Sequence, residues 1–477
     1  MFSPKPRERQ LTFGSYGHTL NHRQAISPDG EWAVYDTRND DTHISRTNAI
    51  EMVHLESGEI VRLYQTANQS EFGPGVGAAS FHPNKPLVAF IHGLENCTRE
   101  KPYSAARRFG AIVDVNLPGQ FFHAEARTVP SEGGVWTRPF GALSGGTHAH
   151  SWSSDGLLSF TYNDLWLEYR SRQDIPFRNP RTVGFMVPSR KVPGTFFSPG
   201  FFSPFFSPFF SSSPPFWLGD SGRVGSAHPT DCSYRANGMD AGCFSGSFGA
   251  FLAASLCENA RVGSDEIEAA VEECWVGEKS NALAFLGAVR GESGELENEI
   301  FVCELPNAND WTVIAAKAVS KTAMEASDLL KPVEGCVQRR LSRTSHRKFP
   351  GIQGPRCWLV SSSDGRFVFA PMRDERGVAQ LCRIAVTDGQ IEQITELEHP
   401  LAGQISLNPS GTLCSFICDQ RICLVDVSSG RTQWLTERSD HLLAGAIHFA
   451  GENRFVFNRF VGAERERWLQ VFVEEMG

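Results

Sequence analysis

Apolar residues along the chain occur in short runs that are separated by turns rich in Ser, Pro, Asp and Gly. The segment AISPDGEWAVYDTR (25–38) has the basic form, which is an apolar stretch, a turn and a second largely apolar stretch. Segments of the same form begin at Ala79, His150, Leu359, Ile405 and Ile447. Paired short strands of this kind predict an all-β fold built from hairpins.

A second phrase, of the form QLT, closes most of these units. It occurs as RQLT from Arg9, VRLYQT from Val61, RRLS from Arg339, EQIT from Glu392 and QWLT from Gln433. Four antiparallel strands in about 45 residues are typical of a β-propeller blade. The expected seven blades lie near 19–65, 77–130, 147–190, 243–340, 352–395, 402–437 and 440–475. Because RQLT has no strand pair before it, we expect the N-terminal strand to complete the last blade and close the ring.

The fourth unit departs from the pattern, although the whole chain, 1–477, is expected to form a single propeller domain. FSGSFGAFLAASL (244–256) is interpreted as its inner strand. The acidic start and apolar spacing of GSDEIEAAVEECW (263–275) predict a short helical insertion. Before it, 194–217 is a low-complexity FFSP repeat, read either as an aromatic docking or membrane-touching loop or as a repeat expansion in a tolerant loop. Frequent proline favours the second reading.

Aligning the units at their turns places histidines in equivalent positions. His22 and His148 fall in the same column, where other units have Gly77, Gly403 and Gly445. This column lies near the start of each inner strand, at one face of the ring. Histidines facing glycines predict a cluster at the channel mouth with room for a ligand.

His148 and His150 are two residues apart, so on a regular strand their side chains share one face, as in HxH metal sites. A divalent metal needs further ligands. Candidates in segments that lead into inner strands are His18, His22, His346 and Gln404. The other interpretation is that the histidines are structural, and the sequence leaves both open.

Composition narrows the classes of function. Hydrophobic residues make up 41% and charged residues 21% of the chain, with a formal net charge of −9, which is ordinary for a globular protein and gives no basic patch for nucleic acid. The absence of a long apolar run predicts no membrane span, and the N-terminus has no apolar signal core, so a cytoplasmic location is expected. The 12 cysteines lack repeated CxxC pairs and are expected to be reduced.

Three segments, GGTHAHSWSSDGLLSFTYND, GSDEIEAAVEECWVG and VQRRLSRTSHRKFPG, resemble those of the YidR-like bacterial proteins, a family without an assigned activity. The blade phrases resemble, more distantly, TolB-type propellers and oligogalacturonate lyases. These resemblances imply TolB-like blades. The lyase resemblance also implies a metal-dependent β-elimination on a uronate-containing oligosaccharide, in which manganese polarises the carboxylate.

By matching residue types to the lyases, the implied site can be assigned to this chain. His148, His150, His346 and Gln404 would bind the manganese. Arg347 or Arg356 would hold the substrate carboxylate during catalysis, and the implied substrate-binding residues are His18, His22 and Trp358.

Two other interpretations remain open from the sequence. The chain could be a non-catalytic TolB-like propeller that binds a protein partner or a glycan through its faces. Alternatively, the histidines could be structural, with no activity. Propellers host both binding and catalysis, so the fold does not decide whether the protein is an enzyme.

Overall fold

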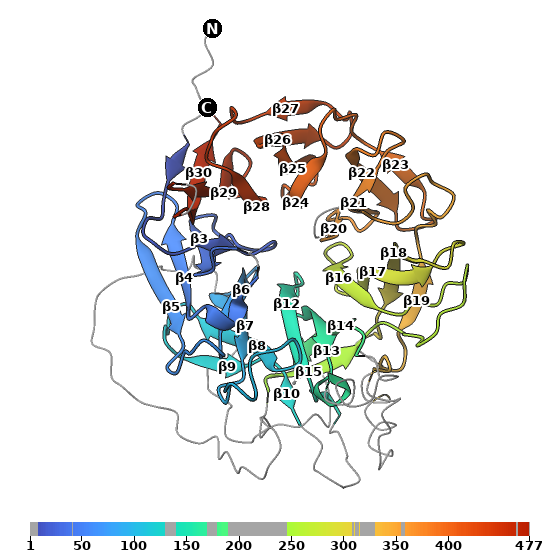
Figure 1. Ribbon diagram of the computed structural model, residues 1–477, viewed down its shortest axis with the longest axis horizontal. Helices are drawn as coiled ribbons and strands as arrows, with labels where there is room; N and C mark the ends of the chain where they lie inside the picture. Colours follow the sequence, from blue (N-terminus) through green and yellow to red (C-terminus); the bar gives the residue numbers. More distant parts are fainter. Residues whose placement is uncertain are drawn as a thin grey trace.

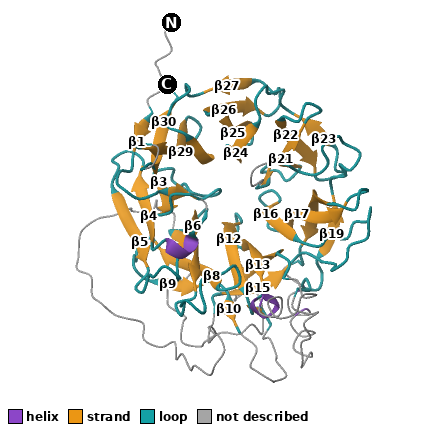
Figure 2. Cartoon of the chain, viewed as in Figure 1, coloured by secondary structure: helices purple, strands orange, loops and turns teal. Residues whose placement is uncertain are grey.

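The fold is all-β, with sheets arranged around a central axis. The computed structural model describes residues 8–40, 42–128, 140–168, 179–188, 246–307, 310, 314, 330–353, 358–463 and 466–476. Figure 1 shows the chain passing from sheet to sheet around the ring, from blue to red. Within these ranges, the main helical segments are the 3-10 turn η1 (Ile44–Arg46) and residues 165–168 (Figure 2).

Five four-stranded sheets follow one another along the described chain. The first two consist of β2 (Thr19–Leu20), β3 (Trp32–Asp36), β4 (Ala49–His54) and β5 (Ile60–Gln65), then β6 (Val76–Phe81), β7 (Leu87–Gly93), β8 (Arg108–Asp114) and β9 (Phe121–His123). The third has β12 (Gly146–Trp152), β13 (Leu158–Asn163), β14 (Thr182–Pro188) and β15 (Phe248–Leu252). The fourth has β16 (Ala270–Trp275), β17 (Ala282–Arg290), β18 (Leu296–Glu304) and β19 (Val337–Arg340). The fifth has β20 (Val360–Ser361), β21 (Phe367–Arg373), β22 (Ala379–Ala385) and β23 (Ile391–Gln393).

The remaining strands form an eight-stranded sheet and a short parallel pair. The large sheet contains β24 (Leu401–Leu407), β25 (Leu413–Cys418), β26 (Arg421–Asp426), β27 (Thr432–Trp434), β28 (Leu443–Phe449), β29 (Arg454–Val461), β30 (Trp468–Glu475) and β1 (Arg9–Gln10). The strands of its two halves pair at one position, Gln404 with Ala446. The parallel pair is β10 (Ala126–Arg127) with β11 (Ala142–Leu143).

The first strand joins the last, as the RQLT phrase predicts. Arg9 pairs with Val473, and Gln10 with Phe472, in an antiparallel ladder. The Leu11 amide donates to the Val471 carbonyl at 2.8 Å. The outer edge of the last sheet is therefore covered by the other end of the chain, which removes an exposed strand edge.

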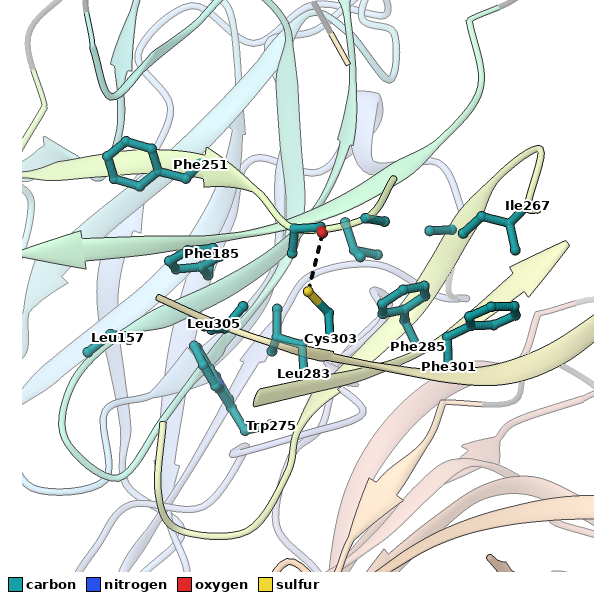
Figure 3. Close-up of a cluster of buried hydrophobic side chains, with 14 of the residues drawn as sticks. Leu157, Phe185, Phe251, Ile267, Trp275, Leu283, Phe285, Phe301, Cys303 and Leu305 are labelled. Atoms are coloured by element: carbon teal, nitrogen blue, oxygen red, sulfur yellow. Dashed lines mark hydrogen bonds between the residues drawn. The ribbon is translucent and has the colours of Figure 1, made fainter. Parts of the chain in front are cut away.

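Apolar cores lie between neighbouring sheets. Figure 3 shows one of them, in which Phe185 and Phe251 of the third sheet approach Trp275, Phe285 and other residues of the fourth. All of these side chains are buried. Packing of sheet on sheet in this way fixes the order of the sheets around the ring, because each face is complementary to its neighbour.

Two expectations for the fourth unit are wrong. Residues 248–252 form β15, which pairs with β14 as the outer strand of the third sheet, rather than an inner strand of the fourth. The expected helix is absent, because Ala270–Trp275 is β16, the inner strand of the fourth sheet. A bulge between Val271 and Cys274 inserts extra backbone into β16, so its apolar residues lose strict alternation and resemble a helical pattern. The FFSP repeat at 194–217 lies outside the described residues.

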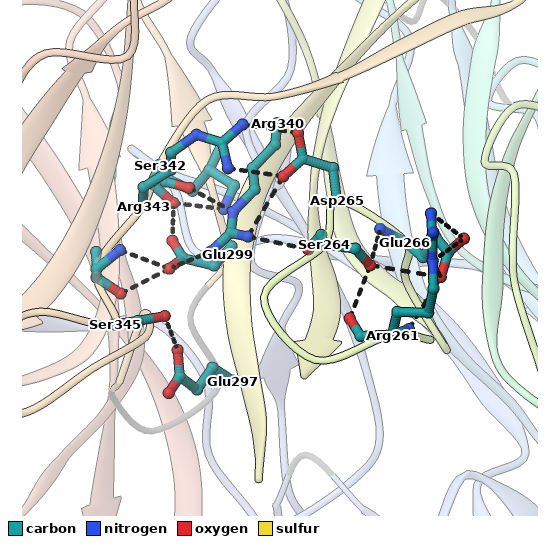
Figure 4. Close-up of polar contacts among 12 residues, drawn as sticks. Arg261, Ser264, Asp265, Glu266, Glu297, Glu299, Arg340, Ser342, Arg343 and Ser345 are labelled. Carbon is teal, nitrogen blue, oxygen red and sulfur yellow. Dashed lines mark hydrogen bonds and ion pairs between the residues drawn. The ribbon is translucent and has the colours of Figure 1, made fainter. Parts of the chain in front are cut away.

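A polar network holds the connection that follows β19. Buried Glu299 accepts hydrogen bonds from the Thr344 backbone amide at 2.7 Å and from Arg340 Nη2 at 3.0 Å, and also from the Ser342 hydroxyl. Asp265 accepts from Arg343 at 2.7 Å. Figure 4 shows Glu299 and Asp265 as two separate acceptors, with Arg340 beside both of them. The network fixes the loop that leads to the fifth sheet.

Among the described residues, no helix combines the length and the apolar character that crossing a membrane requires.

Candidate functional site: the central channel

The inner strands share a bulge near their middle. The register shifts in β6, β12, β16, β24 and β28, and each shift coincides with a residue of positive φ. These residues are Ala78, Ala149, Glu272, Gly403 and Gly445, with φ between 55° and 76°. Since a bulge interrupts the alternation of side chains, residues two apart across it no longer share a face as they do on a regular strand.

His148 and His150 lie on either side of the bulge and make separate contacts. His148 Nδ1 lies 3.1 Å from the Thr161 carbonyl oxygen. His150 is fully buried, and its Nε2 lies 2.9 Å from the Thr147 hydroxyl, which donates to Glu125 at 2.7 Å. The two imidazoles therefore do not form the HxH pair that the spacing alone predicts.

The charges around this pair oppose a metal ion. Burial, with Arg108 as the second cause, lowers the pKa of His150 to about 3. Burial also lowers the pKa of His148, and both Arg108 and Arg181 add to this effect. Burial is the largest cause of both shifts, and the arginines that add to it would also repel a dication. These residues do not fit a manganese site.

The other predicted ligands and catalytic residues lie elsewhere. His346 is exposed on the connection between β19 and β20, and Gln404 is on β24. Arg347 donates to the Arg373 carbonyl at 3.0 Å, and Arg356 is outside the described residues. Across the described ranges, no three His, Cys, Asp or Glu side chains form a group that could hold a metal ion.

His18 is a core residue rather than a channel residue. Its Nδ1 lies 3.2 Å from the Leu469 carbonyl oxygen, and its ring lies between Tyr16 and Tyr35, at centroid distances of 4.3 and 5.0 Å. Burial lowers its pKa to about 4. A neutral imidazole packed in this way stabilises the junction of the first and last sheets.

A cavity of about 910 Å³ occupies the channel. It is lined by the later halves of inner strands and by the turns that follow them. Half-buried apolar side chains form much of its wall, namely Ile26, Val360, Leu407 and Phe449. The volume and this lining are typical of a site for a ligand of several hundred daltons.

His22 and Trp358, two of the predicted substrate-binding residues, come together at the inner end of the channel. Their rings stack with centroids 3.7 Å apart and planes 15° apart. The Arg23 guanidinium carbon lies 5.6 Å from the centroid of the Trp358 ring. His22 and Arg23 also line the cavity, and we call the part of it where Arg23 crosses to the opposite sheets its floor.

Arg23 and Gln24 connect the first sheet to sheets across the channel. Arg23 donates to the carbonyl oxygens of Glu273 at 2.5 Å and Leu359 at 2.6 Å. The Gln24 side chain exchanges two hydrogen bonds with the Trp152 backbone, both at 2.8 Å. Figure 1 shows this dark blue part of the chain, between β2 and β3, extending toward the middle of the ring. The channel is thus obstructed at one level by this segment.

The sequence contains a signal for Arg23 that the search for equivalent histidines missed. In the aligned units, Arg23 occupies the column of Ala78 and Ala149. Its other members are Trp358, Gln404 and Ala446, so Arg23 is the one charged residue in a column that mixes small and large side chains.

The outer mouth of the cavity is acidic. Asp29, Glu31 and Glu452 are exposed on its rim, whereas Arg454 is paired with Glu475 at 3.2 Å. The rim therefore carries an excess of negative charge, which attracts cationic ligands.

Comparisons with known proteins support the family resemblance. Residues 75–195 match the family model described as a protein of unknown function, DUF3748. The chain is 29% identical over 454 residues to the uncharacterized protein YidR of Escherichia coli strain K12, which covers 94% of each chain. The similarity to YidR-like proteins expected from the sequence is confirmed.

Solved structures with a similar fold include an oligogalacturonate lyase in complex with manganese. Its TM-score is 0.53 at 9% identity, covering 100% of this chain and 96% of that chain. The putative TolB from Agrobacterium tumefaciens has a TM-score of 0.39 at 11% identity, covering 90% of this chain and 98% of that chain. At this identity the lyase likeness extends to the fold alone.

Proposed function

We propose that the protein is a seven-bladed propeller that binds a short basic peptide segment of a partner protein in its channel, without catalysing a reaction. The observation that carries the proposal is the cavity of about 910 Å³, which has apolar walls, an acidic mouth and a floor built around Arg23. Concave, largely apolar sites with a few placed polar groups are the usual form of ligand sites.

The sheet topology supports seven blades. Five sheets have four strands each, and the eight-stranded sheet meets at the single pair Gln404 and Ala446. Dividing it there leaves β24–β27 and the set β28, β29, β30 and β1, each with four strands. This gives one blade for each of the seven units in the sequence.

The lining favours a basic, partly apolar ligand. Ile26, Leu407 and Phe449 offer apolar surface, and Asp29 and Glu452 lie on the mouth. An acidic glycan would be repelled by this rim, whereas the side chain of a lysine or arginine would be attracted to it.

Catalysis of the lyase type has no support from the predicted metal ligands. His148 and His150 lie among arginines, and the described residues provide no metal-binding group. Elimination would need a Lewis acid or an equivalent charge beside the substrate carboxylate. Binding without chemistry requires only the cavity.

The proposal can be tested by tryptophan fluorescence, because Trp152 and Trp275 line the cavity. We expect the tripeptide Lys-Leu-Lys to give a saturable change in emission, and Glu-Leu-Glu to give none. The variant Leu407→Arg places a bulky cation in the cavity and should abolish the change.

Val337→Arg is the matched control, because Val337 is an exposed apolar residue on the outer strand β19. It should bind Lys-Leu-Lys as the wild type does. The proposal is wrong if neither peptide gives a saturable change, or if Leu407→Arg binds Lys-Leu-Lys normally.

A further inference from the structure

Arg108, at the start of β8, is a buried cation with few partners. The residue is only 6% exposed to solvent. Nη1 donates to the Tyr103 hydroxyl at 3.2 Å, whereas Nε and Nη2 are buried and have no hydrogen-bond partner in the part of the chain that the structure describes. A buried guanidinium edge without an acceptor is unfavourable, since these N–H groups have lost their hydration without replacement.

The two unpartnered nitrogens belong to one edge of the guanidinium. The N–H groups of Nε and Nη2 point in the same direction, and this edge is the one that binds two oxygens of a carboxylate or phosphate side by side. The edge without partners therefore has the geometry of an oxyanion receptor. A water molecule could satisfy one N–H group, but it would not compensate the charge.

The surroundings of Arg108 are also positive. A Cβ on Gly146 would lie 2.9 Å from Arg108 Cγ, so Arg108 packs against the first residue of β12. Arg108 and Arg181 both act on partly exposed His148 and disfavour its protonation. Arg108 therefore lies with a second arginine beside an imidazole at the start of one strand.

The carboxylate of Glu125, one of those near this strand, is committed to other groups. Glu125 accepts from the Gly110 amide at 3.1 and 3.2 Å and from the Thr147 hydroxyl at 2.7 Å. Burial raises its pKa to about 7, and the arginine that acts on it is Arg127. Glu125 is therefore not the counter-ion of Arg108.

We infer that Arg108 binds an oxyanion through Nε and Nη2, beside His148, at the start of β12. The ligand group is a single carboxylate or phosphate, and two hydrogen bonds from one guanidinium edge hold it. This site replaces the metal site that the HxH spacing predicted, and it is separate from the peptide site proposed for the channel.

Isothermal titration of the full chain with sodium phosphate, sodium acetate and manganese chloride tests the inference. We expect phosphate or acetate to bind at one site per chain, and the stronger of the two identifies the group that the site prefers. Manganese should give no binding heat. The inference is overturned if neither anion binds.

Arg108→Met should weaken anion binding by about tenfold or more, because both hydrogen bonds are lost. Arg107→Met is the matched control, since it removes the same charge from the adjacent residue, whose Nη2 donates to Asn96 Oδ1 at 2.8 Å. Its affinity should stay within about twofold of the wild type. Equal losses in the two variants would refute a specific role for Arg108.

A second measurement covers the case in which Arg108→Met does not fold. The Cε1–H signal of His148 in the wild type, assigned by its loss in His148→Asn, should shift saturably with the anion that binds. A signal that stays constant while the anion binds would place the anion elsewhere and contradict the inference.

Discussion

At the residue scale, one arginine connects sheets on opposite sides of the channel. Arg23 donates to two backbone carbonyls on the far side of the channel, at 2.5 and 2.6 Å. These contacts hold the floor of the cavity in place, together with the stack of His22 on Trp358. The floor is thus built from a side chain of the first sheet and backbone of the fourth and fifth.

Arg23→Met should lower the free energy of unfolding by about 2 kcal/mol, because two carbonyl groups lose a charged donor. Urea denaturation followed by circular dichroism measures the change. Arg366→Met is the control, since Arg366 is exposed and its ion pair is with exposed Asp364. It should change stability by less than about 1 kcal/mol. Equal effects would mean that the contacts of Arg23 contribute nothing specific.

Glu125 gives the protein a pH-dependent stability. Because burial raises its pKa to about 7, the folded state binds a proton more tightly than the unfolded state does. This stabilisation is fully present below about pH 4.5 and is lost as the pH rises to about 7. As the pH rises from about 5 to about 8, the unfolding free energy of Glu125→Gln should therefore increase by about 2 kcal/mol relative to that of the wild type.

Denaturation at several pH values measures this difference. Thr147→Val should change the pH dependence in the opposite direction to Glu125→Gln, because the hydrogen bond from the Thr147 hydroxyl lowers the pKa of Glu125. Without that bond, the decline in stability between the same pH values should be steeper. A pH-independent difference between Glu125→Gln and the wild type would contradict the account.

At the scale of the strand, the turn residues explain what the sequence predicted, and the bulge explains what it did not. The turn residues and the alternating strands beside them predicted the hairpins correctly, because turn chemistry is local. The bulge at Ala149 is not recognisable in the sequence, so the shared face of His148 and His150 was inferred from an alternation that the backbone interrupts. The same feature in β16 led to the expected helix.

The long segment between β14 and β15 caused the other error. Since these two strands are neighbours in space but lie far apart in the sequence, β15 was assigned to the next unit. Composition gives no information about which strand a distant segment pairs with. Arg23 and Trp358 meet for the same reason, through ring closure rather than through a local motif.

Gly403 and Gly445 occupy equivalent bulges and provide a matched pair of variants. Both have positive φ, 68° and 76°, but a Cβ on Gly403 would lie 2.6 Å from the Gly445 carbonyl oxygen, whereas a Cβ on Gly445 has no atom within 4 Å. Gly445→Ala should cost about 1 kcal/mol of backbone strain. Gly403→Ala should cost more, because it adds a steric clash. Denaturant midpoints that are equal, or reversed in order, would contradict this reading.

At the scale of the whole molecule, the two ends of the chain close the ring. β1 pairs with β30, and Arg459 is held by Glu8 at 2.8 Å. The channel exists only while the sheets remain in a ring, so the stability of this closure and the binding of a ligand are coupled.

Leu11→Asp tests the closure, because Leu11 is 3% exposed at the junction of β1 and β30. A buried carboxylate there should lower the unfolding free energy by about 3 kcal/mol or more. Phe13→Asp, two residues away and 65% exposed, should be nearly neutral. Thermal denaturation compares them, and a mild effect of Leu11→Asp would mean that the last sheet is stable without β1.

We propose that the channel binds a basic peptide and that His148 and His150 do not bind a metal. A crystal structure of the protein soaked with both Lys-Leu-Lys and manganese chloride tests both parts together. We expect peptide density between Ile26, Leu407 and Phe449 and no anomalous manganese peak at the histidines. An empty channel with a manganese ion on His148 and His150 would contradict it.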